Sequence, residues 1–123
     1  MGKIKGVELS EIPAPSGVAT DSRGNIYVAS FAENVIYKIS IYGKKVVFSK
    51  SAVIKGPIGV AVDKNDNIYV ANYLANNLIK ISPNGLAEIF ADIEKPYCIY
   101  YDLEHNRIYA TEQGTNKLFK FDI

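Results

Sequence analysis

The sequence has little of what most catalytic and metal centres require. Its 123 residues include one cysteine, Cys98, one histidine, His105, and no tryptophan. A single cysteine excludes an intrachain disulfide framework, and a single histidine excludes any centre that needs two imidazoles from one chain. The formal net charge is only +1, so the chain has no strong field to attract nucleic acid or anionic lipid. We therefore expect neither nucleic acid nor a membrane as a partner.

Long hydrophobic runs are also missing. No apolar run approaches the ~20 residues that a membrane-spanning helix requires, and the first residues lack the apolar segment of a signal peptide. Together with the lone cysteine, this predicts a cytoplasmic protein. There is no phosphate-binding glycine loop, no zinc-ligand spacing and no nucleophile elbow. What remains is an ordinary globular composition, with 48% hydrophobic and 22% charged residues.

A repeat of about 40 residues organises the chain. Similar segments begin at Pro15, Pro57 and Pro96, and Ile-Tyr pairs recur at intervals of 42 and 40 residues. Each repeat contains short apolar or alternating runs separated by turn residues, which predict short β-strands. A period of this length with four short strands is typical of a propeller blade. The sequence thus predicts an all-β fold of four-stranded antiparallel blades, three blades per chain.

The same order of strands is expected in every repeat. A short apolar run indicates an inner strand buried on both faces, at residues 18–20, 60–62 and 99–101. The central strands are expected at residues 25–30, 67–72 and 107–112. Alternating runs predict half-exposed third strands at residues 35–40, 77–82 and 117–122. Outer strands are expected at about residues 45–50 and 86–91.

Aspartate and asparagine recur once per repeat. The aspartates that follow the inner strands are Asp21, Asp63 and Asp102, and the loop asparagines are Asn34, Asn76 and Asn116. In turns, an aspartate side chain binds the amides that follow it, and asparagine tolerates a positive φ. We therefore interpret both sets as structural turn residues and not as a carboxylate cluster for a metal.

The three repeats form one expected domain, residues 1–123, with the repeats at 15–51, 57–91 and 96–123. The third repeat lacks an outer strand, and a spare strand-like segment at residues 3–12 precedes the first. Propellers close with about four to eight blades, and an open end would leave apolar faces and a bare strand edge in water. We therefore expect a homodimer that forms one six-bladed ring, in which residues 3–12 complete the partner's last blade. Tyr100 and Tyr101 are expected to pack at this interface.

The segments P-S-G-V-A-T-D and N-I-Y-V-A of the first repeat, with their counterparts in the next two, resemble the NHL repeat. They are also similar to repeats of the gluconolactonase/senescence-marker and virginiamycin B lyase families. The resemblance covers residues 15–122 and implies a propeller. These families include protein- and RNA-binding platforms, a peptide-amidating lyase and lactone hydrolases, so the resemblance leaves the function open.

Departures from the repeat indicate the candidate site. NHL repeats commonly carry an aspartate after the central strand, and the resemblance places this position at the mouth of the channel. Here the position holds Ser30, Asn72 or Glu112. Aromatic residues nearby would provide exposed apolar contacts. The expected ligand-binding residues are Ser30, Phe31, Asn72, Tyr73, Tyr97, Glu112 and Gln113.

Two functional hypotheses follow. The first is a non-catalytic scaffold without a cofactor, which binds an unknown protein or small molecule at the channel mouth. The alternative is a small metal-dependent hydrolase of the lactonase type, in which oxygens of Glu112 and Asn72 hold a hard cation such as Ca²⁺. A two-fold ring would duplicate each ligand, whereas the lactonase sites are asymmetric.

Cys98 replaces a repeat glycine and lacks a nearby base, since His105 is expected on the opposite face. We therefore expect Cys98 to be a small buried residue.

Overall fold

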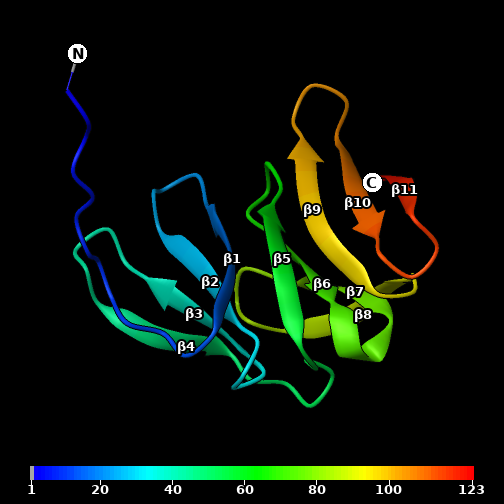
Figure 1. Ribbon diagram of the computed structural model, residues 1–123, viewed down its shortest axis with the longest axis horizontal. Helices are drawn as coiled ribbons and strands as arrows, with labels where there is room; N and C mark the ends of the chain where they lie inside the picture. The colour runs from blue at the N-terminus through cyan, green and yellow to red at the C-terminus, as the bar shows by residue number, and fades with distance from the viewer. Residues whose placement is uncertain (1) are drawn as a thin grey trace.

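The computed structural model describes residues 2–123, which form three antiparallel sheets arranged side by side (Figure 1). Blade 1 consists of β1 (Pro15–Thr20), β2 (Ile26–Ser30), β3 (Val35–Ile39) and β4 (Lys45–Ser49). Blade 2 consists of β5 (Pro57–Val62), β6 (Ile68–Asn72), β7 (Asn77–Ile81) and β8 (Ala87–Asp92), with the 3₁₀ helix η1 (Tyr73–Ala75) between β6 and β7. Blade 3 has three strands, β9 (Pro96–Asp102), β10 (Arg107–Glu112) and β11 (Lys117–Asp122). The strands follow one another across each sheet, as the repeat predicted.

The turn between the inner and central strands is held by its aspartate. Asp21 Oδ1 accepts hydrogen bonds from the backbone N–H groups of Arg23, at 2.9 Å, and Asn25, at 3.0 Å. Asp63 makes the equivalent pair of bonds in blade 2, at 2.8 and 3.0 Å. The prediction that these aspartates are structural turn residues is therefore confirmed.

The other carboxylate oxygen of each aspartate accepts from a tyrosine on the central strand. The Tyr27 hydroxyl lies 2.9 Å from Asp21 Oδ2, and the Tyr69 hydroxyl lies 2.9 Å from Asp63 Oδ2. Burial, followed by the hydrogen bond to the carboxylate, raises the pKa of both tyrosines well above its usual value. Each hydroxyl therefore stays protonated and remains a donor that ties a turn to the core of its blade.

Blade 3 departs from this arrangement. Asp102 Oδ2 lies 2.8 Å from His105 Nδ1, and this hydrogen bond lowers the pKa of Asp102. Tyr109 stands where Tyr69 stands in blade 2, but no hydrogen bond joins it to Asp102 within the described residues. The aspartate of this turn is therefore tied to a surface histidine. The link from the turn to the core comes from Tyr101, whose hydroxyl donates to Asn106 Oδ1 at 2.7 Å and whose ring packs between blades 2 and 3.

The hydrophobic core lies between the blades. Tyr27 and Ile36 of blade 1 pack against a set from blade 2 that includes Ile68 and Ile79. On its other side, blade 2 packs against blade 3 through residues that include Ala61, Tyr69, Leu78, Ala71, Ile108 and Ala110. Blade 2 is thus covered on both faces, whereas blades 1 and 3 each have one open face.

These open faces correct one prediction. The inner strands were expected to be buried on both faces, and this holds for β5 alone. Val18 on β1 is 64% exposed and Tyr100 on β9 is 66% exposed, because no blade covers them. Tyr101 points the other way, into the contact between blades 2 and 3. Of the two tyrosines assigned to an interface, only Tyr100 thus lies on an open face. Cys98 is also exposed, contrary to expectation.

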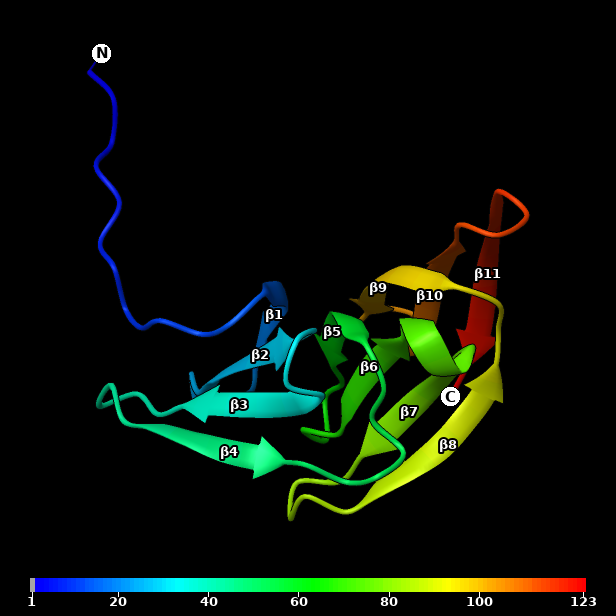
Figure 2. The ribbon, with the colours of Figure 1, turned by 60° about the horizontal axis from the view of Figure 1, so that its bottom comes forward.

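Residues 2–12 form an extended segment without a strand assignment, and its first residues point away from the blades (Figure 2). Its later residues, from Val7 to Ile12, border a hollow with Val18 and Val28 on the face of blade 1 that no blade covers. We call this segment the N-terminal arm. Its contact with the blade includes a hydrogen bond of 2.9 Å from Lys45 Nζ to the carbonyl oxygen of Glu11. The expected strand at residues 3–12 is not formed here, and its pairing with another chain stays a prediction. Among the described residues, no helix has the length and apolar character needed to cross a membrane.

Candidate functional site

The three polar residues that end the central strands, Ser30, Asn72 and Glu112, are buried. Ser30 Oγ donates to the carbonyl oxygen of Pro13, at 2.6 Å, and accepts from the backbone N–H of Glu33, at 3.3 Å. Ser30 has no exposed surface. Its side chain holds the approach to β1 against the loop that follows β2.

Asn72 is likewise fully buried, and it joins three segments. Its Oδ1 accepts from the backbone N–H of Lys55 at 2.7 Å, while Nδ2 donates to the carbonyl oxygen of Val53 at 2.7 Å and to Asn77 Oδ1 at 2.9 Å. Glu112 is 7% exposed, and its Oε1 accepts from the backbone N–H of Thr115, at 3.0 Å, and from the Thr115 hydroxyl. The structure therefore places these residues at the predicted strand ends, with their polar atoms engaged within the chain.

These hydrogen bonds affect whether Glu112 and Asn72 could bind a metal ion. Residues 2–123 contain no cluster of three or more His, Cys, Asp or Glu side chains that could hold a metal ion. A Ca²⁺ site requires six to eight oxygen ligands. Asn72 would have to give up hydrogen bonds that hold the segment before β5 in place. The donor set thus does not fit a hard cation.

The aromatic candidates do come together. Phe31 and Tyr97 border one open hollow of about 450 Å³, together with Ala14, Pro15, Ser16 and Ile58. The ring of Tyr73 lies edge-on to that of Tyr97, with the centroids 6.3 Å apart. Phe31 is 37% and Tyr97 39% exposed. We call Phe31, Tyr73 and Tyr97 the aromatic mouth.

Glycines lie where the inner strands approach one another next to the residues of this hollow. A Cβ at Gly17 would lie 2.1 Å from the carbonyl oxygen of Ile58, and a Cβ at Gly59 would lie 2.5 Å from that of Tyr97. Only glycine permits such close approach of β1 to β5 and of β5 to β9. The starts of the inner strands therefore converge beneath the aromatic mouth.

Sequence reasoning missed Ser16 as part of this surface. Its hydroxyl donates to the carbonyl oxygen of Pro57, at 2.8 Å, and so links β1 to β5. The available signal was its place between Pro15 and Gly17, in the repeat position also held by Ile58 and Tyr97. Gln113, the remaining candidate, is exposed, and its backbone N–H donates to the carbonyl oxygen of Lys95 at 3.1 Å.

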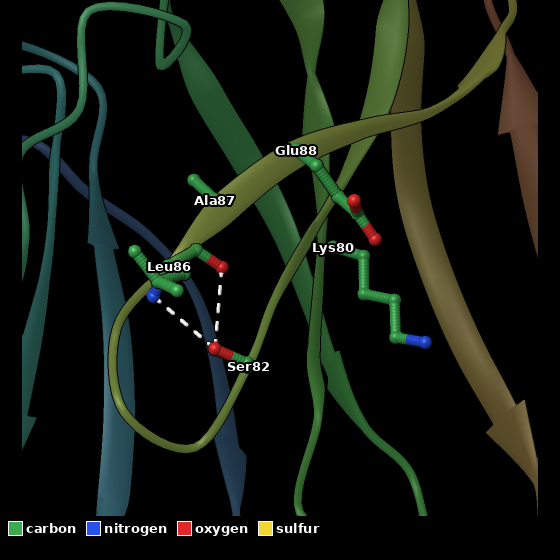
Figure 3. A pocket seen from close by; sticks show the side chains of 5 residues that line it. All are labelled: Lys80, Ser82, Leu86, Ala87 and Glu88. Atoms are coloured by element: carbon green, nitrogen blue, oxygen red, sulfur yellow. Dashed lines mark hydrogen bonds between the residues drawn. The ribbon is translucent and has the colours of Figure 1, made fainter.

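A second hollow lies on the hairpin of β7 and β8, bordered by Lys80, Ser82, Leu86, Ala87 and Glu88 (Figure 3). Ser82 Oγ accepts from the backbone N–H of Leu86 at 3.2 Å, and Lys80 and Glu88 are cross-strand neighbours. These contacts hold a surface turn at the outer part of blade 2. The hairpin is distant in the sheet order from the inner strands, so we do not assign it to the site.

No family model and no curated protein matches the chain. Solved structures do. A catalytically inactive variant of virginiamycin B lyase from Staphylococcus aureus, with quinupristin, superposes over 99% of this chain with a TM-score of 0.74 at 20% identity. Hydrazine synthase from Kuenenia stuttgartiensis superposes over 98% with a TM-score of 0.76 at 16% identity. The chain has a β-propeller fold.

The selenomethionine form of the Staphylococcus aureus lyase gives a similar result, with a TM-score of 0.70 over 89% of this chain at 16% identity. At these identities the likeness is one of fold. The chain spans less than half of each structure, 46%, 36% and 41% in the order given. The likeness therefore covers only a part of each of these structures.

Proposed function

We propose that the protein is a non-catalytic binding module whose binding surface is the aromatic mouth. Half-exposed aromatic rings on a rigid scaffold provide a large contact area at little cost in side-chain entropy. The observation that supports the proposal is the contrast between polar and aromatic side chains at the strand ends. There the polar side chains are buried and hydrogen-bonded, and the adjacent rings stay open to solvent.

The chemistry of the hollow favours a neutral group. None of the described residues that border it carries a charge, and Ser16 and Tyr97 contribute the side-chain hydroxyls among them. A neutral aromatic or apolar group would bury its surface against Phe31 and Tyr97 without leaving a charge unpaired. The ligand we propose is a small molecule or a protein segment that presents such a group.

A lactonase-type hydrolase is not favoured. It would depend on Glu112 and Asn72 as ligands of a cation. Glu112 instead holds the loop that follows it, and Asn72 holds the segment before β5. His105, which could act as a base elsewhere, is bonded to Asp102 at the turn between β9 and β10. Virginiamycin B lyase shares the fold, but a shared propeller fold does not carry an activity with it.

We further propose that two copies form one six-bladed ring. Large apolar side chains are exposed on the open faces of blades 1 and 3, including Val18, Tyr100 and Leu118 at 64%, 66% and 68%. Since propellers close with about four to eight blades, a second set of three would cover both faces. Light scattering should give about twice the chain mass of 13.6 kDa. A folded species at the mass of one chain would contradict the ring.

Binding at the mouth can be tested with small neutral probes. Saturation-transfer NMR with indole, phenol and benzamide should show contact with the wild-type protein. Phe31→Ser and Tyr97→Ser should each weaken binding roughly tenfold, the scale of losing one aromatic anchor. The matched control is Tyr42→Ser, because Tyr42 is 91% exposed on the turn between β3 and β4. Equal binding by the mouth variants and by the control would refute the proposed surface.

A further inference from the structure

At each junction between blades inside the chain, one asparagine side chain bonds to the backbone just before the next inner strand. The Oδ1 atom of Asn34 accepts from the backbone N–H of Gly56 at 2.8 Å, and that of Asn76 accepts from the backbone N–H of Lys95 at 3.0 Å. Both asparagines have a φ of 56°. The donor residues also have positive φ values, 61° for Gly56 and 43° for Lys95, and each immediately precedes the proline that begins an inner strand.

Both halves of this junction are present again, unjoined, at the open sides of blades 1 and 3. Asn116 has a φ of 60°, and Ala14, which precedes Pro15, has a φ of 44°. The Ala14 carbonyl oxygen accepts from the backbone N–H of Phe31 at 3.0 Å, as the Gly56 carbonyl oxygen accepts from that of Tyr73. Within residues 2–123, neither the Ala14 N–H nor the Asn116 side chain has a hydrogen-bond partner.

The backbone of Ala14 makes this observation specific. A positive φ is uncommon for alanine, and the residue before a proline is normally extended. Ala14 nonetheless takes the conformation of the two donor residues, which leaves its N–H positioned as theirs are. The open side of blade 1 is therefore built as a donor and the open side of blade 3 as the matching acceptor.

The sheet faces agree with this pairing. On the side of blade 1 that no other blade covers, the row Val18–Val28–Tyr37 occupies the register positions of Val60–Val70–Ile79, which pack against blade 1. On blade 3, the open pair Tyr100–Tyr109 occupies the positions of Ala61–Tyr69, which pack against blade 3. Each open face is thus the counterpart of a face that is buried inside the chain.

The free edge of β11 is a further feature that a second copy could pair with. β11 pairs with β10 alone, and the N-terminal arm is extended, with Val7 82% and Leu9 66% exposed. An extended arm with exposed apolar residues has the form of a strand that lacks an edge to pair with. The complementary donor, acceptor, faces and edge all belong to the same chain, so the occupant they fit is a second copy.

We infer that a second copy completes the aromatic mouth by a junction in which Asn116 of one copy accepts from the Ala14 N–H of the other. This rests on the proposed ring. Tyr73 contacts Tyr97 across the junction of blades 2 and 3, and the equivalent positions at the new junction are Gln113 and Ser16. The partner's Gln113 therefore lies beside Ser16 at the hollow. The ligand class narrows to neutral molecules that carry an amide or hydroxyl next to an aromatic ring.

The junction is tested by Asn116→Gly, because glycine keeps the positive φ and removes the side-chain amide. The dimer contains two such bonds, so its dissociation constant, measured by analytical ultracentrifugation, should rise by about 10- to 100-fold. Asn34→Gly is the matched control: it should lower the thermal midpoint, because its bond lies within the chain, with little change in the dimer constant. If both variants leave the dimer constant unchanged, the junction is refuted.

A second pair of variants changes exposed side chains and leaves the positive-φ loop residues intact, so its result does not depend on how the loops fold. Leu118→Glu places a charge on the open face of blade 3, where Leu118 is already 68% exposed, and should give folded monomers. Leu86→Glu is the control, since Leu86 is 71% exposed at the β7–β8 turn and should leave the dimer intact. Dimers formed equally well by both would overturn the inference.

The role of Gln113 has its own measurement. Gln113→Ala should weaken the binding of benzamide several-fold, leave indole binding unchanged and preserve the dimer. Unchanged benzamide binding would show that Gln113 is not part of the mouth.

The outcomes distinguish the proposed ring from the proposed junction. A monomeric wild-type chain overturns the ring itself. A wild-type dimer that is disrupted by Leu118→Glu but insensitive to Asn116→Gly overturns the junction alone.

Discussion

Replacing Tyr69 by phenylalanine removes one hydroxyl from the core and should destabilise the fold measurably. The hydroxyl donates to Asp63 Oδ2 at 2.9 Å, with Tyr69 1% and Asp63 7% exposed. A hydrogen bond to a charged acceptor contributes about 1.5–3 kcal/mol, and the carboxylate would be left partly unsatisfied. The edge-to-face contact between Tyr69 and Phe90, at 5.2 Å, would remain. The expected loss is therefore about 2 kcal/mol, from the hydrogen bond alone.

The matched control is Tyr109→Phe in blade 3. Tyr109 is the positional equivalent of Tyr69, but its hydroxyl makes no hydrogen bond to the turn aspartate, so the loss should stay below ~1 kcal/mol. Urea unfolding followed by circular dichroism, at pH 7 and one fixed protein concentration, measures both variants, since association would otherwise shift the midpoint. Equal losses for the two substitutions would refute the assignment of the Tyr69–Asp63 bond as a core link.

Two further predictions concern pH and backbone approach. Burial would raise the pKa of Asp21, but hydrogen bonds from neighbouring side chains and backbone amides outweigh it and hold the pKa below 3.8. The stability that Asp21 contributes is therefore present above about pH 4 and lost as the pH falls further, and Asp21→Asn should flatten the urea midpoint between pH 5 and 2. Gly59→Ala would place a Cβ 2.5 Å from the carbonyl oxygen of Tyr97 and should cost about 1–3 kcal/mol in a thermal melt. Gly6→Ala, with nothing within 4 Å, should be neutral.

The strand order followed from local rules that the sequence shows directly. Asp21 and Asp63 form turns with amides two and four residues away, and Asn34 and Asn76 adopt the positive φ that asparagine tolerates. Such interactions do not depend on distant parts of the chain. The period of the repeat then sets how many sheets form, and the register follows from the alternation within each strand.

The site was harder to predict because its polar side chains form hydrogen bonds with backbone groups that are distant in the sequence. Asn72 was expected at an open mouth, but it turns inward to the backbone of Val53 and Lys55, 19 and 17 residues away. Nothing near residue 72 in the sequence shows that those groups need a partner. The aromatic residues were easier, since Phe31 directly follows a central strand, Tyr97 lies at the start of an inner strand, and both border the same hollow.

Cys98 indicates that the proposed junction between copies differs in width from the junctions inside the chain. It occupies the repeat position of Gly17 and Gly59, where a Cβ would meet the next inner strand at 2.1 and 2.5 Å, against 3.4 Å or more for an ordinary contact. In the proposed ring, a second copy would not approach β9 as closely as β5 approaches β1. A ring of two chains would have four narrow junctions and two wider ones. The wider junctions are the ones that would bring Gln113 and Ser16 to the mouth. The extra width opens the hollow on the side where the partner adds a polar group, so the ring would present an elongated, two-fold site.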